Sequence, residues 1–144
     1  MILISLGSCH HDLSRDKENM MATDRQYSEL SEKGGMKAAF LSMFDSSGVL
    51  LRRNHLPVVG IQQIKELLGQ KEDTSFILSW KPLSGTIASS GDLGYTYGLY
   101  EIKQKSTRHT LGEGTYCTIW RKTKDDKWKA VLDTGNPGLS EPTK

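Results

Sequence analysis

Few residues in this chain of 144 residues have types and spacings that could do chemistry by themselves. His10 and His11 stand beside Asp12, and imidazole and carboxylate groups are metal ligands. Because no further ligands follow at an ordered spacing, we expect no metal site. Cys117 lies within a run of β-forming residues, where a free thiol usually packs as a small hydrophobic side chain. No obvious pair of nucleophile and base is present, so any chemistry depends on side chains that the fold brings together.

Cys9 has a different setting, because it follows Leu6-Gly7-Ser8 and an apolar start of the chain. Small residues directly before a cysteine are typical of the site at which bacterial lipoproteins are lipidated. The apolar run is short and has no Lys or Arg before it, so residues 1–15 are either a truncated lipoprotein-type signal with its linker or a frayed tail. We favour the lipoprotein interpretation. It predicts a protein of the bacterial cell envelope that contacts the membrane only through lipid on Cys9; without that lipid the protein would be cytoplasmic.

The composition argues against nucleic acid as a partner. Nineteen basic and 17 acidic residues give a formal charge of +2. The densest basic cluster, residues 121–127, also contains two aspartates and is better explained as a solvated hairpin tip than as a phosphate-binding surface. No segment reaches the roughly 18 apolar residues of a transmembrane helix. The length fits one domain.

The pattern of apolar residues predicts an α+β fold. Helical spacing predicts helices over residues 15–33, 36–44 and 60–68, the first with Met20, Asp24 and Tyr27 on one face. Residues 45–48 read as a turn and 49–53 as a strand, and residues 76–82 and 83–89 as strand broken at Pro82. The β-branched and aromatic runs at 91–101, 114–121 and 127–133 predict successive antiparallel strands. We expect a curved antiparallel sheet wrapped around about three N-terminal helices, with a pocket between them.

Several short motifs, in this order and spacing, resemble the SnoaL-like branch of the nuclear transport factor 2-like superfamily. They occupy residues 22–31, 37–41, 57–60, 91–98, 118–121 and 128–137. The resemblance covers residues 16–138 and leaves 139–144 as a C-terminal tail. It implies a cone-shaped fold but no particular function, because the superfamily includes isomerases, dehydratases, cyclases and binding modules.

The ketosteroid isomerases of this superfamily need a tyrosine, a carboxylate base and a protonated acid. Laid against this chain, the tyrosine position falls on Tyr27, the base position on Arg52 and the acid position on Thr118. Arg52 cannot accept a proton, because its guanidinium stays charged. The resemblance therefore does not extend to isomerase chemistry, and we expect none.

The same alignment predicts which side chains line the pocket. With Thr118 inward, strand alternation directs Tyr116 and Trp120 inward, and Val131 and Asp133 on the neighbouring strand. An Arg52–Asp133 ion pair is expected inside the cavity, because an unpaired buried charge is costly. For residues 94–101 the inward face stays open: either Tyr95, Tyr97 and Leu99, or Gly94, Thr96 and Gly98. The predicted ligand-binding residues are Tyr27, Arg52, Trp80, Tyr97, Tyr116, Thr118, Trp120, Val131 and Asp133.

Three functional hypotheses follow. The first is a binding module that holds a small amphipathic molecule in the cone and needs no cofactor. The second is a hydrolase or lyase that uses Asp133 with His55 or Tyr27. The third is a domain that forms a homodimer through the outer face of its sheet, as members of the superfamily that the chain resembles often do. The lack of a second inward carboxylate favours the first hypothesis over the second.

Overall fold

The computed structural model describes residues 12–69 and 74–140. Cys9, and the lipid attachment predicted for it, lie outside these residues, as do His10 and His11. None of the helices in the described part of the chain is long and apolar enough to cross a membrane.

Three helices precede most of the sheet. They are α1 (Leu13–Gly34), α2 (Met36–Met43) and α3 (Ile61–Leu67). α1 begins before residue 15, inside the predicted linker, because the Asp12 side chain caps it by accepting a hydrogen bond from the backbone N–H of Arg15 at 3.1 Å. α1 and α2 are separated at Gly35, whose φ of 92° is a left-handed value that favours glycine.

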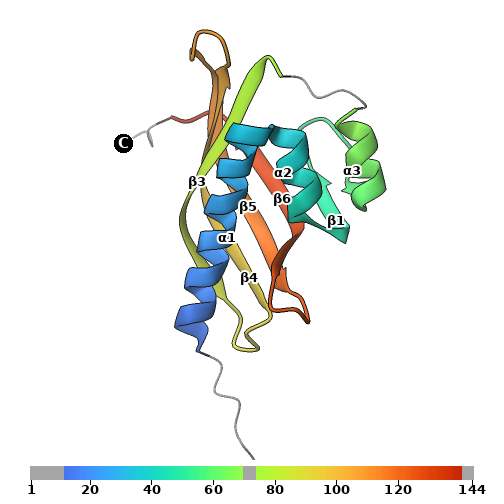
Figure 1. Cartoon of the computed structure of the whole chain (residues 1–144), viewed down its shortest axis with the longest axis vertical. Coiled ribbons are helices and arrows are strands. Elements are labelled where there is room, and N and C mark those ends of the chain that lie inside the picture. The colour runs from blue at the N-terminus through green and yellow to red at the C-terminus, as the bar shows by residue number, and fades with distance from the viewer. Residues whose placement is uncertain (1–11, 70–73, 141–144) are drawn as a thin grey trace, which may run out of the picture.

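Six strands form one curved sheet that wraps around α1 and α2 (Figure 1). The strands are β1 (Phe44–Leu51), β2 (Val58–Val59), β3 (Phe76–Ile87), β4 (Leu93–Gln104), β5 (Thr110–Lys122) and β6 (Trp128–Pro137), in the spatial order β2-β1-β6-β5-β4-β3. The predicted α+β class and curved sheet are confirmed. The sheet is not wholly antiparallel, however, because β1 and β6 run parallel.

Two predicted interruptions are wrong. Residues 45–48 belong to β1, which pairs irregularly with β6 between Phe44 and Val49. β3 runs through Pro82 and continues after a bulge at Leu83. Proline is tolerated there because β3 is an edge strand, which leaves one row of its backbone amides without a strand partner.

Helix α1 covers the free edge of β3. Ser31 Oγ donates a hydrogen bond to the carbonyl oxygen of Leu78 at 2.7 Å, and the backbone N–H of Trp80 donates to Ser28 Oγ at 2.8 Å. These two serines replace part of the missing strand partner, so the edge is protected from pairing with other chains. They also fix the rotation of α1 against the sheet, which aims Asp24 inward.

The inward face of β4 is now settled. Gly94, Thr96 and Gly98 are buried, whereas Tyr95 and Tyr97 are exposed on the outer face. The glycines allow close approach: a Cβ at Gly94 would lie 2.7 Å from the sulfur of Met20 on α1. Burial alternates as expected for a strand, and the small residues take the side on which the helix packs.

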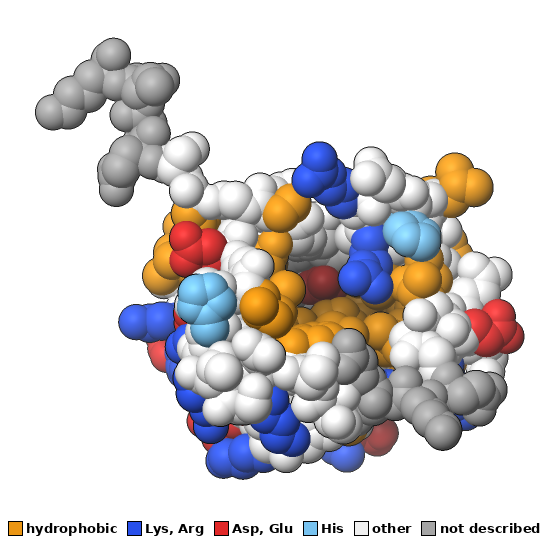
Figure 2. Space-filling model, turned by 90° about the horizontal axis from the view of Figure 1, so that it is seen from above, with side chains coloured by type: hydrophobic (Ala, Val, Ile, Leu, Met, Phe, Trp, Pro, Cys, Tyr) orange, Lys and Arg blue, Asp and Glu red, His pale blue; other side chains and the backbone are white. Residues whose placement is uncertain are grey.

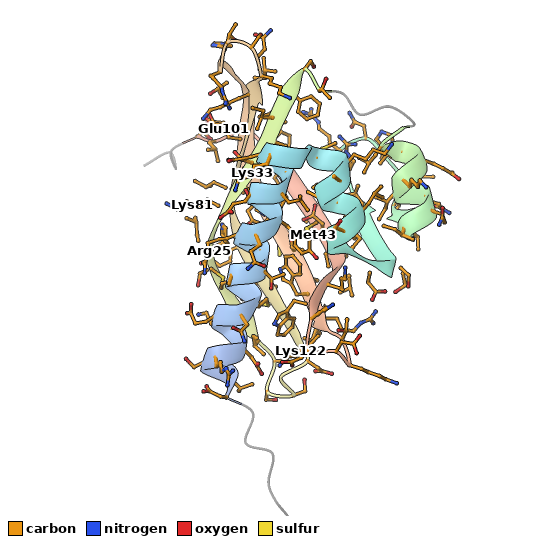
Figure 3. All side chains as sticks on the ribbon, viewed as in Figure 1. Arg25, Lys33, Met43, Lys81, Glu101 and Lys122 are labelled. Atoms are coloured by element: carbon orange, nitrogen blue, oxygen red, sulfur yellow. The ribbon has the colours of Figure 1, made fainter. Side chains whose placement is uncertain are left out.

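The apolar core lies between the helices and the concave face of the sheet. Met43 projects from α2 into this space (Figure 3). The buried members of the core are Met20, Met43, Phe44, Leu50, Ile64, Trp120, Trp128 and Ala130.

An ionic cluster lies at the start of α1, near the lower end of the molecule in Figure 3. Lys122 Nζ lies 2.7 Å from Asp16 Oδ1 and 2.8 Å from Asp126 Oδ1, and 5.8 Å from the centre of the Trp128 ring. Lys122 is therefore not simply part of a solvated hairpin tip. It ties the first turn of α1 to the β5–β6 hairpin.

Candidate ligand-binding cavity

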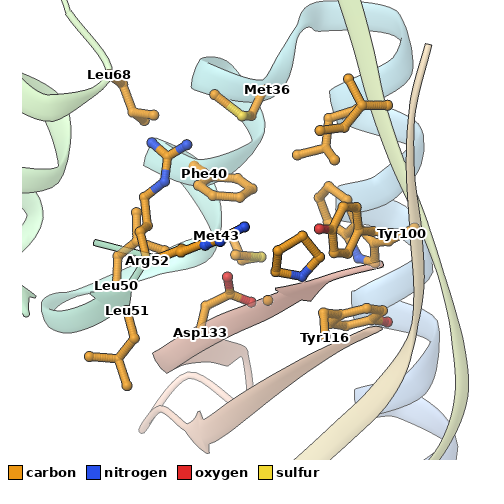
Figure 4. A pocket seen from close by; sticks show the side chains of 16 residues that line it. Met36, Phe40, Met43, Leu50, Leu51, Arg52, Leu68, Tyr100, Tyr116 and Asp133 are labelled. Atoms are coloured by element: carbon orange, nitrogen blue, oxygen red, sulfur yellow. The ribbon is translucent and has the colours of Figure 1, made fainter. Parts of the chain in front are cut away.

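A cavity of about 240 Å³ opens between α2, α3 and the sheet. Figure 2 looks down into it and shows apolar walls, an acidic side chain deep inside and basic side chains at the rim. Figure 4 shows the lining from close by. Its apolar and aromatic lining residues are Met36, Phe40, Met43, Leu50, Leu51, Leu68, Leu78, Trp80, Tyr100, Ile102, Tyr116 and Pro137.

Asp133 is the acidic residue of this lining within the described part of the chain. It is half-buried, and its Oδ2 accepts a hydrogen bond from Thr118 Oγ1 at 2.6 Å. Its other carboxylate oxygen has no hydrogen-bond donor among the described residues, and no described cation pairs with it. Burial raises the pKa of Asp133 to about 6; the Thr118 hydrogen bond opposes this rise and the charge of Asp24 adds to it. Asp133 is thus an open hydrogen-bonding group in an apolar cavity.

Asp24 is a second inward carboxylate, which was not predicted from the sequence. It is fully buried on α1, and its two oxygens accept hydrogen bonds from Trp80 Nε1 at 2.6 Å and from the Tyr116 hydroxyl at 2.8 Å. Thr96 also hydrogen-bonds to it. Burial raises the pKa of Asp24, and these hydrogen bonds oppose the rise. Asp24 therefore links α1 to β3, β4 and β5 directly behind the cavity wall.

Tyr116 joins this buried network to the cavity. Its ring lines the cavity, and its hydroxyl hydrogen is engaged by Asp24. Burial, followed by the negative charge of Asp24, raises the pKa of Tyr116, so the phenol stays protonated. Its oxygen can accept a hydrogen bond from a ligand but has no proton left to donate.

The predicted Arg52–Asp133 ion pair is wrong. Arg52 lines the cavity, but its side chain is exposed and forms no ion pair within the described residues. β1 ends at Leu51, and the chain turns at once, with the backbone N–H of His55 donating to the Arg52 carbonyl at 3.2 Å. At the rim the guanidinium can stay hydrated. It therefore avoids the cost of an unpaired buried charge, which was the reason to expect the ion pair.

Three of the predicted ligand-binding residues lie outside the cavity lining. The Tyr27 ring stacks on Trp120, with ring centres 6.2 Å apart, and its hydroxyl donates to the carbonyl of Ser42 at 3.0 Å. Trp120 is fully buried and donates to Thr96 Oγ1 at 2.8 Å. Thr118 is buried beneath Asp133. None of these three residues lines the cavity.

Three further predicted residues lie elsewhere. Tyr97 is on the outer face of the sheet. Val131 is the extra residue of a bulge, because Ile119 pairs with Leu132 while Trp120 pairs with Ala130. Ala130 therefore takes the buried position that simple alternation gave to Val131. His55 is exposed in the loop after β1 and does not line the cavity.

Of the predicted ligand-binding residues, the cavity thus brings together Arg52, Trp80, Tyr116 and Asp133. Neither His55 nor Tyr27 is available to Asp133 there, so the hydrolase or lyase hypothesis loses both of its named partners. What remains is a concave site with apolar inner walls, one open carboxylate and basic side chains at its rim, which can hold a ligand and orient it through a hydrogen bond.

Comparison with known proteins identifies the fold. No protein-family model and no curated protein matches the chain. Among solved structures, a ketosteroid isomerase-like protein from Erwinia carotovora atroseptica is 13% identical with a TM-score of 0.68, covering 91% of this chain and 99% of that one.

Two further solved structures agree with this fold. A nuclear transport factor 2-like protein from Novosphingobium aromaticivorans is 15% identical with a TM-score of 0.69, covering 85% of this chain and 82% of that one. A nuclear transport factor 2-like superfamily protein from Salmonella enterica serovar Typhimurium is 15% identical with a TM-score of 0.65, covering 88% and 94%. The chain therefore has the nuclear transport factor 2-like cone fold that the sequence motifs predict.

Proposed function

We propose that this protein binds a small amphipathic molecule in the cavity, with the apolar body of the ligand against the aromatic walls and a hydrogen-bond donor of the ligand on Asp133. The observation that carries the proposal is the open, half-buried Asp133 carboxylate among the apolar inner walls of the cavity. A polar group in such a place costs free energy unless it is hydrogen-bonded. A ligand that donates to it would recover this cost, and its apolar body would gain from burial.

Gly135 offers a way to fill the cavity without changing the charge. It lines the cavity on β6, and a Cβ there would lie 3.4 Å from Tyr100 Cε1 on β4, so a larger side chain would occupy part of the cavity. We expect Gly135→Met to fold, because a methionine can adapt its shape to an irregular cavity. We also expect it to lose ligand binding, because its side chain would fill space that the ligand needs. The measurement is native mass spectrometry of the purified protein for a co-purified molecule.

The matched control is Thr134→Met, which adds the same side chain to the next residue of β6, where strand alternation directs it to the outer face. It should keep the bound molecule. Equal occupancy in Gly135→Met and the wild type would show that the molecule does not lie in this cavity.

The outer face of the sheet favours a second role, self-association. The helices cover only the inner face (Figure 1), and β4 presents a row of exposed apolar side chains on the other. This row, which we call the outer apolar row, consists of Leu93, Tyr95, Tyr97 and Leu99. Exposed apolar rows of this kind are typical of protein interaction surfaces. A second copy of the chain, stacked face to face, would cover both rows at once.

Tyr97→Lys tests this role. We expect wild-type protein at micromolar concentration to sediment as a dimer and Tyr97→Lys to sediment as a monomer, because a lysine ammonium at the centre of the interface would be desolvated on dimerisation. The control is Ser106→Lys, which adds the same charge in the exposed β4–β5 loop and should leave the dimer intact. A monomeric wild type would exclude the proposed dimer.

A further inference from the structure

Two arginines stand side by side at the rim of the cavity. Arg52 and Arg53 both line it and both are exposed, and neither forms an ion pair within residues 12–69 and 74–140. By contrast, Arg121 on the sheet pairs with Asp45 at 3.3 Å. The rim therefore carries two guanidinium groups that form no ion pair with a described carboxylate, and these make the mouth of the cavity attractive to anions.

The two ends of the cavity carry opposite charges and opposite hydrogen-bonding groups. Deep inside lies the Asp133 carboxylate, which accepts hydrogen bonds when ionised. At the mouth lie Arg52 and Arg53, which can only donate. Between the two ends the walls include Phe40 and Tyr100 and are largely apolar (Figure 4). A ligand that satisfies both ends needs a donor at one end, an anion at the other and a flat apolar body between.

We propose, building on the binding function above, that the ligand is a hydroxy acid with an aromatic or similarly flat body, whose hydroxyl donates to Asp133 and whose carboxylate lies at the mouth against Arg52 and Arg53. The planar guanidinium matches a carboxylate by paired hydrogen bonds. The anion stays partly hydrated at the exposed rim, so the large cost of a buried ion does not arise. The hydroxyl, which is neutral, is the end that enters the apolar interior.

Three naphthalene probes that differ in one group each test the two ends separately by isothermal titration calorimetry at neutral pH. The first, 6-hydroxy-2-naphthoate, has the hydroxyl and the carboxylate. The second, 6-methoxy-2-naphthoate, cannot donate to Asp133. The third, 6-hydroxy-2-naphthamide, lacks the anion. We expect the first to bind most tightly and each of the others to bind about tenfold more weakly, the usual effect of losing one hydrogen bond to a charged group.

The double variant Arg52→Gln/Arg53→Gln should lose most of the tenfold preference for the carboxylate over the amide while binding the amide as the wild type does. The control, Arg15→Gln/Arg108→Gln, removes the same two charges from exposed positions outside the cavity lining and should keep the preference.

The outcomes separate the two proposals. If the carboxylate and the amide bind equally, or if both double variants keep the preference, the anion-binding role of the mouth is wrong while the cavity remains a binding site. If none of the three probes binds, both the ligand class and the proposed binding function are overturned.

Discussion

Asp24→Ala is expected to lower the free energy of unfolding by about 2–6 kcal/mol, because two donors at the cavity wall would each lose their acceptor. Trp80 Nε1 and the Tyr116 hydroxyl both donate to Asp24, and both residues lie at the cavity wall. Each buried donor left without a partner costs about 1–3 kcal/mol. Because a domain of this size is stable by only about 5–15 kcal/mol, the variant would be near the limit of folding.

Urea unfolding followed by tryptophan fluorescence measures this loss. Asp24→Asn keeps one acceptor oxygen and should cost less than Asp24→Ala, which provides a graded comparison if the alanine variant does not fold. Asp125→Ala is the control, because Asp125 is exposed at the β5–β6 turn, and it should change the free energy of unfolding by less than about 0.5 kcal/mol. An Asp24→Ala protein as stable as Asp125→Ala would show that the buried network does not hold α1 to the sheet.

The sequence was sufficient to predict most of the fold. The long strands are rich in β-branched and aromatic residues and are bounded by turn residues, so β4, β5 and β6 lie where expected, although each extends further than predicted. The three helices follow from their apolar periodicity. The prediction failed where tertiary structure overrides a local signal: Pro82 does not end β3, because an edge strand tolerates it. Residues 45–48 lie within β1, in the irregular stretch between Phe44 and Val49, the two residues that pair with β6 on either side of it.

The residues of the candidate site were harder to predict than the fold. A register shift of one residue changes which side chains of a strand face the cavity. A bulge in β6 places Ala130, and not Val131, in the buried position next to Trp120. Strand alternation alone cannot reveal a bulge. The position of Asp24 on the apolar face of α1 was visible in the sequence, and an aspartate there was the available signal of a buried acceptor. Its donors, Trp80 and Tyr116, come from strands far along the chain, so no local pattern could identify the network.

Asp133→Asn is expected to have the opposite effect on stability from Asp24→Ala. Because no described cation pairs with Asp133, and Thr118 supplies its one described hydrogen bond, the ionised carboxylate is held in the folded state at a cost. The pKa of Asp133 is raised from an ordinary value near 3.8 to about 6, so the folded state binds the proton more tightly than the unfolded state does. Stability therefore falls as the pH rises between these two values, by about 3 kcal/mol at most, since one pKa unit corresponds to about 1.4 kcal/mol.

The asparagine amide imitates the protonated carboxyl group and can still accept from Thr118. Asp133→Asn should thus raise the free energy of unfolding by up to about 3 kcal/mol near pH 7 and by almost nothing near pH 4, where Asp133 of the folded wild type is already protonated. Urea unfolding at both pH values measures this, with Asp125→Asn as the exposed control that should change little at either. A gain of equal size at both pH values would mean that the charge of Asp133 is not its cause, and a loss near pH 7 would mean that the carboxylate has a stabilising partner after all. A carboxylate that weakens the fold at neutral pH is typical of a functional site, so we expect the same variant to bind 6-hydroxy-2-naphthoate more weakly than the wild type even though it is more stable.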